Sequence, residues 1–127
     1  MRALLLLLPI VAFGCSNELS GSISLSEGKF VPTSCQNLVR IGQRGVELED
    51  DKSRRVRLIE LPDGSADAIW FEGSSGKGKK FSDCVTLSVR DQKSTVNKVK
   101  NVMGEAELDC QKGDDELSGK VTFENCH

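Results

Sequence analysis

Several residue types on which common active sites depend are scarce in this chain. Its 127 residues include no tyrosine, one tryptophan and one histidine, and the histidine, His127, is the last residue. A serine or cysteine nucleophile needs a base to accept its proton, and histidine is the usual base. Residues at a chain end are poorly held in most domains. The sequence therefore disfavours nucleophilic catalysis, and we predict that the protein is not an enzyme.

The chain also lacks an excess of charge of either sign. Its 17 lysine and arginine residues are balanced by 19 aspartate and glutamate residues, which gives a net charge of −2. Nucleic-acid binding draws most of its affinity from a large positive charge, so we expect no nucleic-acid partner. Apolar residues make up 38% and charged residues 28% of the chain, which is typical of a globular protein. This length predicts a single domain.

No apolar run is long enough to cross a bilayer as a helix. The longest, residues 3–13, follows the basic residue Arg2 and falls short of the roughly 20 residues that a transmembrane helix needs. A basic residue, a short apolar segment and small residues before Cys15 are typical of an export signal. We therefore predict a signal peptide over residues 1–14 and a mature chain that begins at Cys15.

The residues Ala12-Phe13-Gly14-Cys15 resemble the lipobox of bacterial lipoproteins. In that family the cysteine receives diacylglycerol before cleavage and becomes the acylated N-terminus. The resemblance implies a lipid on Cys15, a membrane partner through that lipid and, because Ser16 follows the cysteine, the outer membrane of a two-membrane bacterium. An ordinary secretory signal would be cut at the same bond, and either signal exports the protein.

The number of cysteines favours lipidation. With Cys15 acylated, an even set remains in the domain: Cys35, Cys84, Cys110 and Cys126. Exported proteins meet an oxidising compartment, so we predict two disulfides. The spacing contains no Cys-x-x-Cys pair, and we expect neither a metal site nor a cofactor. Four cysteines allow three pairings; closing the shortest loops favours Cys35–Cys84 with Cys110–Cys126, although a tight hairpin before Cys126 would separate it from Cys110.

Apolar and polar residues alternate with a period of two in most of the chain. Leu19, Ile23 and Leu25 alternate with serines, as in a strand with one buried face. Seven segments have this pattern, or eight if residues 38–41 also pair: 19–25, 46–49, 55–61, 66–71, 85–90, 102–110 and 117–123. Residues 34–41 and 94–103 have weak helical spacing, and we interpret the second as a strand. The prediction is an all-β antiparallel sandwich or barrel over residues 19–127, after a tether at 15–18.

Two short sequences recur along the chain. Residues 18–21 and 116–119 both read Glu-Leu-Ser-Gly, and residues 45–48 resemble residues 104–108 in beginning with glycine before alternating residues. The second similarity comes in the opposite order, which argues against a tandem duplication. We interpret the recurrence as strands that carry a glycine where another backbone comes close.

Basic residues gather in two clusters, one at positions 52–57 and one at 77–80. Residues 73–80 nearly match a phosphate-binding loop, but no hydroxyl residue follows the lysine, so we interpret them as a basic loop. A strand would project Arg55 and Arg57 to one side. The predicted contact surface for an anionic envelope partner comprises Arg55, Arg57, Lys77, Lys79 and Lys80, with a solvated surface as the alternative.

These observations predict an exported, lipid-anchored envelope protein that acts as a binding or structural module. An alternative is a small lipoprotein inhibitor of an exported hydrolase such as lysozyme, because size, anchor and cysteines are similar to those of such inhibitors. A third hypothesis is a carboxylate-based hydrolase, for which the pairs Asp50–Asp51 and Asp114–Asp115 are candidates. Both pairs adjoin polar stretches, which favours solvated turns instead.

Overall fold

The computed structural model describes residues 17–73 and 76–127, and these residues form an all-β sandwich. The predicted signal peptide, residues 1–14, and Cys15 lie outside the described residues. Within the described residues there are ten strands and one short 3-10 helix, namely β1 (Glu18–Leu25), β2 (Lys29–Phe30), β3 (Ser34–Asn37), η1 (Leu38–Ile41), β4 (Arg44–Glu49), β5 (Arg55–Glu60), β6 (Ala66–Phe71), β7 (Lys79–Ser82), β8 (Val85–Val96), β9 (Val99–Lys112) and β10 (Asp115–Cys126). The predicted fold class is confirmed.

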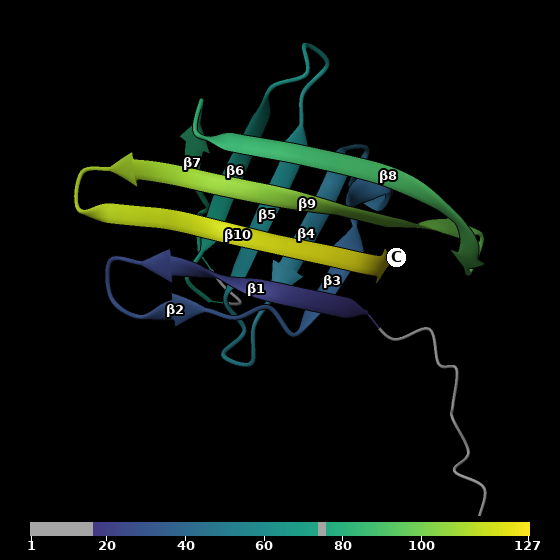
Figure 1. The fold of residues 1–127 in the computed structure, drawn as a ribbon, viewed down its shortest axis with the longest axis horizontal. Coiled ribbons are helices and arrows are strands. Elements are labelled where there is room, and N and C mark those ends of the chain that lie inside the picture. The colour runs from purple at the N-terminus through teal and green to yellow at the C-terminus, as the bar shows by residue number, and fades with distance from the viewer. Residues whose placement is uncertain (1–16, 74–75) are drawn as a thin grey trace, which may run out of the picture.

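The strands form two antiparallel five-stranded sheets. One sheet has the order β2-β1-β10-β9-β8 and the other the order β3-β4-β5-β6-β7. Figure 1 shows the first sheet in front, with its strands running across those of the second sheet behind it. Strands adjacent in the sequence are neighbours within each sheet, and β1 pairs with β10. The first and last long strands of the domain therefore lie side by side.

The core lies between the two sheets and follows the predicted alternation. In β4, Val46 and Leu48 are fully buried, while Glu47 and Glu49 point to the outer face. Ile23 from β1 and Phe30 from β2 are also fully buried. Because one face of each sheet is covered, the period of two in the sequence corresponds directly to burial.

The structure contains more strands than the seven or eight that the sequence predicted. The strands β2, β3 and β7 are two to four residues long, too short to show a clear period. Residues 38–41 form the helix η1 instead of a strand, because the Asn37 side chain accepts a hydrogen bond from Val39 N at 3.0 Å and Gly42 ends the helix at a φ of 75°. Residues 94–103 are extended as predicted, apart from a turn at 97–98.

The interpretation of the recurring glycines is confirmed. A Cβ atom on Gly104 would lie 1.8 Å from the backbone oxygen of Ser88, and one on Gly45 would lie 1.9 Å from that of Leu58. Gly21 and Gly119 are equally restricted, since β1 and β10 approach each other closely there. Residues 18–21 and 116–119 thus lie in the paired strands β1 and β10, whereas residues 45–48 and 104–108 lie in β4 and β9 of different sheets. All four segments place a glycine at a close backbone contact.

The turn between β8 and β9 holds a lysine in an unfavourable conformation. Asn97 and Lys98 both have positive φ values, 50° and 66°, as in the two-residue turns that suit hairpins. Asparagine tolerates this region, whereas the second position favours glycine because a side chain is strained there. Backbone conformation alone therefore favours glycine at position 98.

Lys98→Gly is expected to stabilise the domain by about 0.5–1 kcal/mol, because relief of left-handed strain exceeds the added entropy of the unfolded chain. Urea unfolding monitored by circular dichroism measures this change. Val99→Gly is the matched control and should destabilise the domain, because Val99 lies in β9 with an extended backbone. A lower midpoint for Lys98→Gly would contradict the strain argument.

The disulfide pairing favoured by loop length is wrong. Cys35 is bonded to Cys126 and Cys84 to Cys110, with Cα–Cα distances of 5.1 and 5.0 Å. The strand β3 lies beside the end of β10, which brings Cys35 to Cys126 although 91 positions separate them. Pairing of β8 with β9 places Cys84 beside Cys110, and Asp109 N donates to Cys84 O at 2.9 Å. The arrangement of the strands decides the pairing, because the packing of β3 beside β10 already brings the two ends of the 91-residue segment together.

Two disulfides indicate an extracytoplasmic protein, since such bonds persist in oxidising compartments. Within residues 17–73 and 76–127, no helical segment has the length and apolar character that a bilayer crossing requires.

Candidate functional site

A cleft of about 320 Å³ opens at one end of the sandwich, between loops of the two sheets. The turn after β1 and the turn between β9 and β10 form one side, and residues of β5, β6 and β7 or their flanking loops form the other. The lining residues are Leu25, Ser26, Glu27, Arg54, Trp70, Glu72, Phe81, Asp114, Asp115, Glu116 and Leu117. This volume suits a small ligand or a single inserted side chain.

Trp70 is the aromatic centre of the cleft and is held by three neighbours. Its indole Nε1 donates to Glu72 Oε2 at 2.7 Å. Phe30 packs edge-on against it with ring centroids 5.7 Å apart, and the Arg54 guanidinium lies 5.8 Å from the indole ring. An aromatic ring fixed on several sides loses little freedom when a ligand binds.

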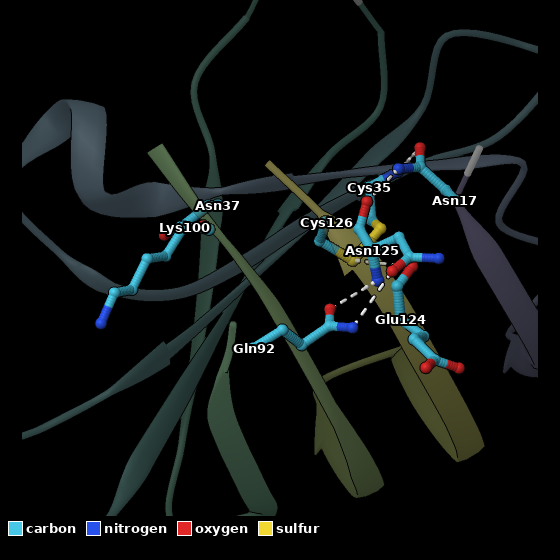
Figure 2. The surroundings of a disulfide bond; sticks show 8 residues. All are labelled: Asn17, Cys35, Asn37, Gln92, Lys100, Glu124, Asn125 and Cys126. Atoms are coloured by element: carbon cyan, nitrogen blue, oxygen red, sulfur yellow. Dashed lines mark hydrogen bonds between the residues drawn. A yellow bond between two sulfur atoms is a disulfide. The ribbon is translucent and has the colours of Figure 1, made fainter. Parts of the chain in front are cut away.

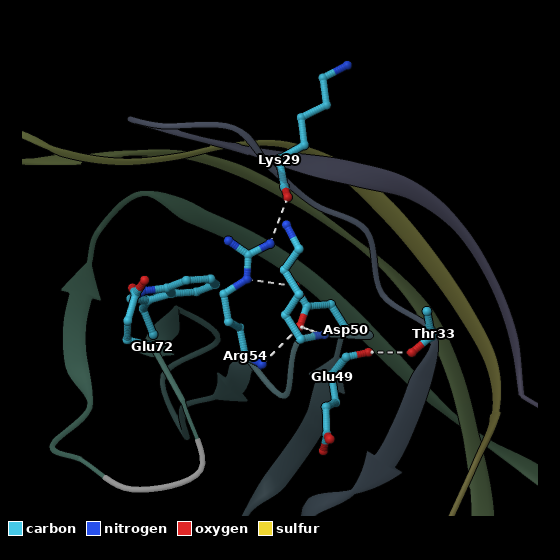
Figure 3. A network of polar contacts seen from close by, with 8 residues as sticks. Lys29, Thr33, Glu49, Asp50, Arg54 and Glu72 are labelled. Carbon is cyan, nitrogen blue, oxygen red and sulfur yellow. Dashed lines mark hydrogen bonds and ion pairs between the residues drawn. The ribbon is translucent and has the colours of Figure 1, made fainter.

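A buried ion pair positions Arg54 beside this ring. The side chain of Asp50 is 1% exposed, and its Oδ2 accepts from Arg54 Nε at 2.7 Å. Its Oδ1 accepts from the backbone N of Lys52 and of Arg54, at 3.0 and 2.9 Å. Arg54 also donates to Lys29 O at 2.9 Å and thereby joins the loop 50–54 to β2 of the other sheet, as Figure 3 shows.

The opposite wall is held by hydrogen bonds between two turns. Ser26 Oγ donates to Asp114 O and accepts from Glu116 N at 2.9 Å. Glu116 Oε1 accepts from Ser118 Oγ at 2.8 Å, and Asp115 forms an ion pair with Lys79. These contacts join the turn after β1 to the start of β10, and the ion pair joins β10 to β7 of the other sheet.

The cleft is strongly acidic. Its lining contains five carboxylates and one guanidinium, and that guanidinium is already paired with Asp50. One of the five carboxylates, Asp115, is paired with Lys79, so four carboxylates have no cationic partner among the lining residues. Asp114 and Asp115 lie at an exposed turn, as the sequence predicted. Asp50 is the exception, because it lies in a turn but is buried, not solvated. The surplus of negative charge next to an aromatic ring favours a cationic ligand.

Arg55 and Arg57 lie together on the outer face of β5, as predicted, but their charge is partly compensated. Their guanidinium groups approach Glu47 Oε1 at 3.4 and 3.0 Å. Both also stack on Phe71, at 4.4 and 5.0 Å from the ring centroid. The side chains are only 23% and 24% exposed. Both guanidinium groups are thus occupied by contacts with Glu47 and Phe71 on the sheet surface, which argues against an open anion-binding site.

The structure separates the three predicted lysines. Lys80 faces outward from β7, in the same row as Arg57, and its Nζ lies 3.4 Å from Asp67 Oδ2. Lys79 points towards the cleft and pairs with Asp115. Lys77 is exposed in the preceding loop. The five residues of the predicted contact surface therefore belong to three different surroundings.

The cleft could not be predicted from the sequence. Trp70 is the single tryptophan and Asp50 lies in a polar stretch, and no local pattern relates either residue to the distant turn at 113–116. The one sequence feature that could have indicated a site is the presence of a single tryptophan together with several acidic turns. This feature does not show which of these turns lie beside the tryptophan in the folded domain.

No protein-family model, no curated protein and no solved structure matches this chain. The functional interpretation therefore depends on the residues and their geometry.

Proposed function

We propose that this protein is an exported, lipid-anchored binding module of the bacterial envelope, and that its cleft binds a cationic group of a partner. The observation that carries the proposal is the fixed indole of Trp70 at the centre of an acidic cleft. The two disulfides support an oxidising compartment, and the lipobox-like residues before Cys15 support a lipid anchor.

The chemistry of the cleft suits a lysine or arginine side chain presented by a partner protein. An ammonium or guanidinium group is attracted to an indole ring and forms charge-assisted hydrogen bonds with carboxylates. The cleft volume of about 320 Å³ is at the small end of the range for ligand sites, which favours one side chain over a large ligand. The contacts that hold Trp70 and join the two turns lower the entropic cost of binding.

Inhibition of an exported hydrolase such as lysozyme is the second candidate. The acidic turns at the mouth of the cleft favour it, because they could contact basic side chains of such an enzyme. Incubation with lysozymes, followed by measurement of cell-wall hydrolysis, tests this candidate. Unchanged hydrolysis with an excess of the protein would exclude inhibition of lysozyme.

Binding of a tetra-arginine peptide is expected to change the fluorescence of Trp70 in a saturable way. The chain contains one tryptophan and no tyrosine, so the emission comes from the cleft alone. Glu72→Gln removes one charge but retains an acceptor for the indole, and should weaken binding about fivefold. Glu107→Gln removes an equivalent exposed charge from β9, outside the cleft, and serves as the control. Equal affinity in both variants would contradict the proposed site.

The mature N-terminus is expected to be acylated Cys15. Mass spectrometry of membrane-extracted protein should show a diacylglyceryl or triacyl group on this residue. Cys15→Ser should release the protein into the soluble fraction, because the proposed lipid is the membrane anchor. An unmodified Cys15 would contradict the lipid anchor and leave the cleft as a separate proposal.

A further inference from the structure

The described chain begins at the end of the sandwich opposite the cleft. In Figure 1 the start of β1 and the turn between β8 and β9 lie on the right, and the turns that line the cleft lie on the left. Asn17 Oδ1 accepts from Cys35 N at 3.0 Å, and Asn17 Nδ2 donates to Asn125 O at 2.7 Å, as Figure 2 shows. The chain start is thus fastened beside the Cys35–Cys126 disulfide.

This attachment limits how far the domain can lie from a lipid on Cys15. Cys15 precedes the fastened Asn17 by two positions. Each residue of a fully extended chain spans at most about 3.6 Å, so the lipid would be attached within about 7 Å of Asn17. A domain held this closely must place its N-terminal end near the membrane surface.

The same end contains a hollow of about 600 Å³ between η1 and the β8–β9 turn. Arg44, Lys98 and Lys100 line it together with the aliphatic side chains of Val39 and Val99. Asn37 Nδ2, at the start of η1, donates to Lys100 O at 2.9 Å and holds the two walls together. The lining thus combines cationic and apolar groups, which is the combination that interfacial membrane binding uses.

The helix η1 beside the hollow carries two exposed apolar residues. Val39, which lines the hollow, and Ile41 are 54% and 53% exposed, and the exposed Arg40 lies between them in the sequence. Aliphatic side chains of this size gain free energy when they leave water. Side chains that combine basic and aliphatic character around one hollow favour a lipid surface over a purely polar partner.

Asp91 is the one carboxylate side chain among the described residues that line the hollow. It accepts from Arg44 Nη1 at 2.7 Å, and this hydrogen bond lowers the pKa of Asp91. Near the chain start, the hydrogen bond that Glu124 shares with Glu18 raises the pKa of Glu124 and makes it easier to protonate beside an anionic surface. Lys98 forms no ion pair within residues 17–73 and 76–127.

We propose that this surface, formed by Val39, Arg40, Ile41, Lys98 and Lys100 and here called the anchor-side surface, docks on anionic phospholipid head groups. A head-group phosphate occupies the hollow beside Lys98 and Lys100, and Val39 and Ile41 enter the interface. The inference relies on the proposed lipid anchor for its orientation. It holds the domain upright, with the acidic cleft directed away from the membrane and open to a partner.

Lys98 gives a direct test, because the backbone at position 98 favours glycine. We therefore expect the Lys98→Gly substitution to remove this charge without loss of folding. The mature chain with Cys15→Ser, prepared without lipid, is mixed with vesicles of phosphatidylcholine with or without phosphatidylglycerol, and the bound fraction is measured by sedimentation. Binding is expected only with phosphatidylglycerol. The double variant Lys98→Gly and Lys100→Ser should bind about 25-fold more weakly, which corresponds to about 1 kcal/mol for each basic residue.

The matched control is Lys29→Ser with Lys77→Ser, which removes the same charge elsewhere. Figure 3 shows that the Lys29 side chain points away from its surroundings, and Lys77 is exposed. This variant should bind as the unaltered chain does. Equal losses in the two double variants, or equal binding to neutral and anionic vesicles, would overturn the anchor-side surface. Neither result depends on whether Cys15 is acylated.

A second measurement tests the orientation of the lipidated protein. Brominated phospholipids quench tryptophans that enter the interface, and the native Trp70 lies in the cleft at the opposite end. Vesicle-bound protein should show little quenching, whereas the variant Val39→Trp should show a strongly quenched second tryptophan. Quenching of native Trp70, or no added quenching in Val39→Trp, would overturn the upright orientation.

Discussion

Removal of the Cys35–Cys126 disulfide is expected to lower the free energy of unfolding by about 4–5 kcal/mol. The bond joins residues 91 positions apart, and its loss frees a long loop in the unfolded chain. It also connects β3 of one sheet with β10 of the other. Both cysteines are buried, at 3% and 0% exposure, so their replacement by alanine removes packing as well.

The matched control for this prediction is the second disulfide. Cys84→Ala with Cys110→Ala opens a loop of 26 positions and should cost about 3–4 kcal/mol. Urea unfolding compares the two double variants, and peptide mapping under non-reducing conditions identifies the pairs. A smaller loss for the Cys35–Cys126 variant, or a mapped Cys35–Cys84 peptide, would contradict the observed arrangement.

Asp50→Ala is expected to lower the free energy of unfolding by about 3–5 kcal/mol, because it leaves a partly buried charge without its partner. The side chain of Arg54 is only 14% exposed and would lose its carboxylate. Two backbone N–H groups of the loop 50–54 would lose their acceptor. Since Arg54 lies against Trp70, the fluorescence of Trp70 should also shift towards that of a solvated indole.

Two variants separate these contributions. Asp50→Asn keeps an oxygen that accepts from the loop backbone and should cost less than Asp50→Ala. Asp51→Ala removes the adjacent exposed carboxylate and should leave both stability and emission nearly unchanged. Chemical unfolding and emission spectra measure all three variants. Equal effects of Asp50→Ala and Asp51→Ala would contradict a structural role for the buried ion pair.

The class of fold could be predicted because alternation records burial directly. Val46 and Leu48 point inward while Glu47 and Glu49 point outward, and this pattern alone indicates a strand with one covered face. The same reasoning failed for β2, β3 and β7, since two to four residues do not establish a period. The helix η1 depends on the Asn37 cap and Gly42, which are weaker signals than alternation.

The candidate site and the disulfide pairing were decided by the tertiary structure. Trp70, Arg54 and the turn at 113–116 meet because β6 and β5 of one sheet cross the ends of β1, β9 and β10 of the other. Cys35 meets Cys126 for the same reason. By itself the sequence determined the strand pattern, the positions of close-contact glycines and the likeness of the N-terminus to an export signal, all of which depend on neighbouring residues. Contacts between distant segments depend on strand order and on the packing of one sheet against the other, and no local pattern contains that information.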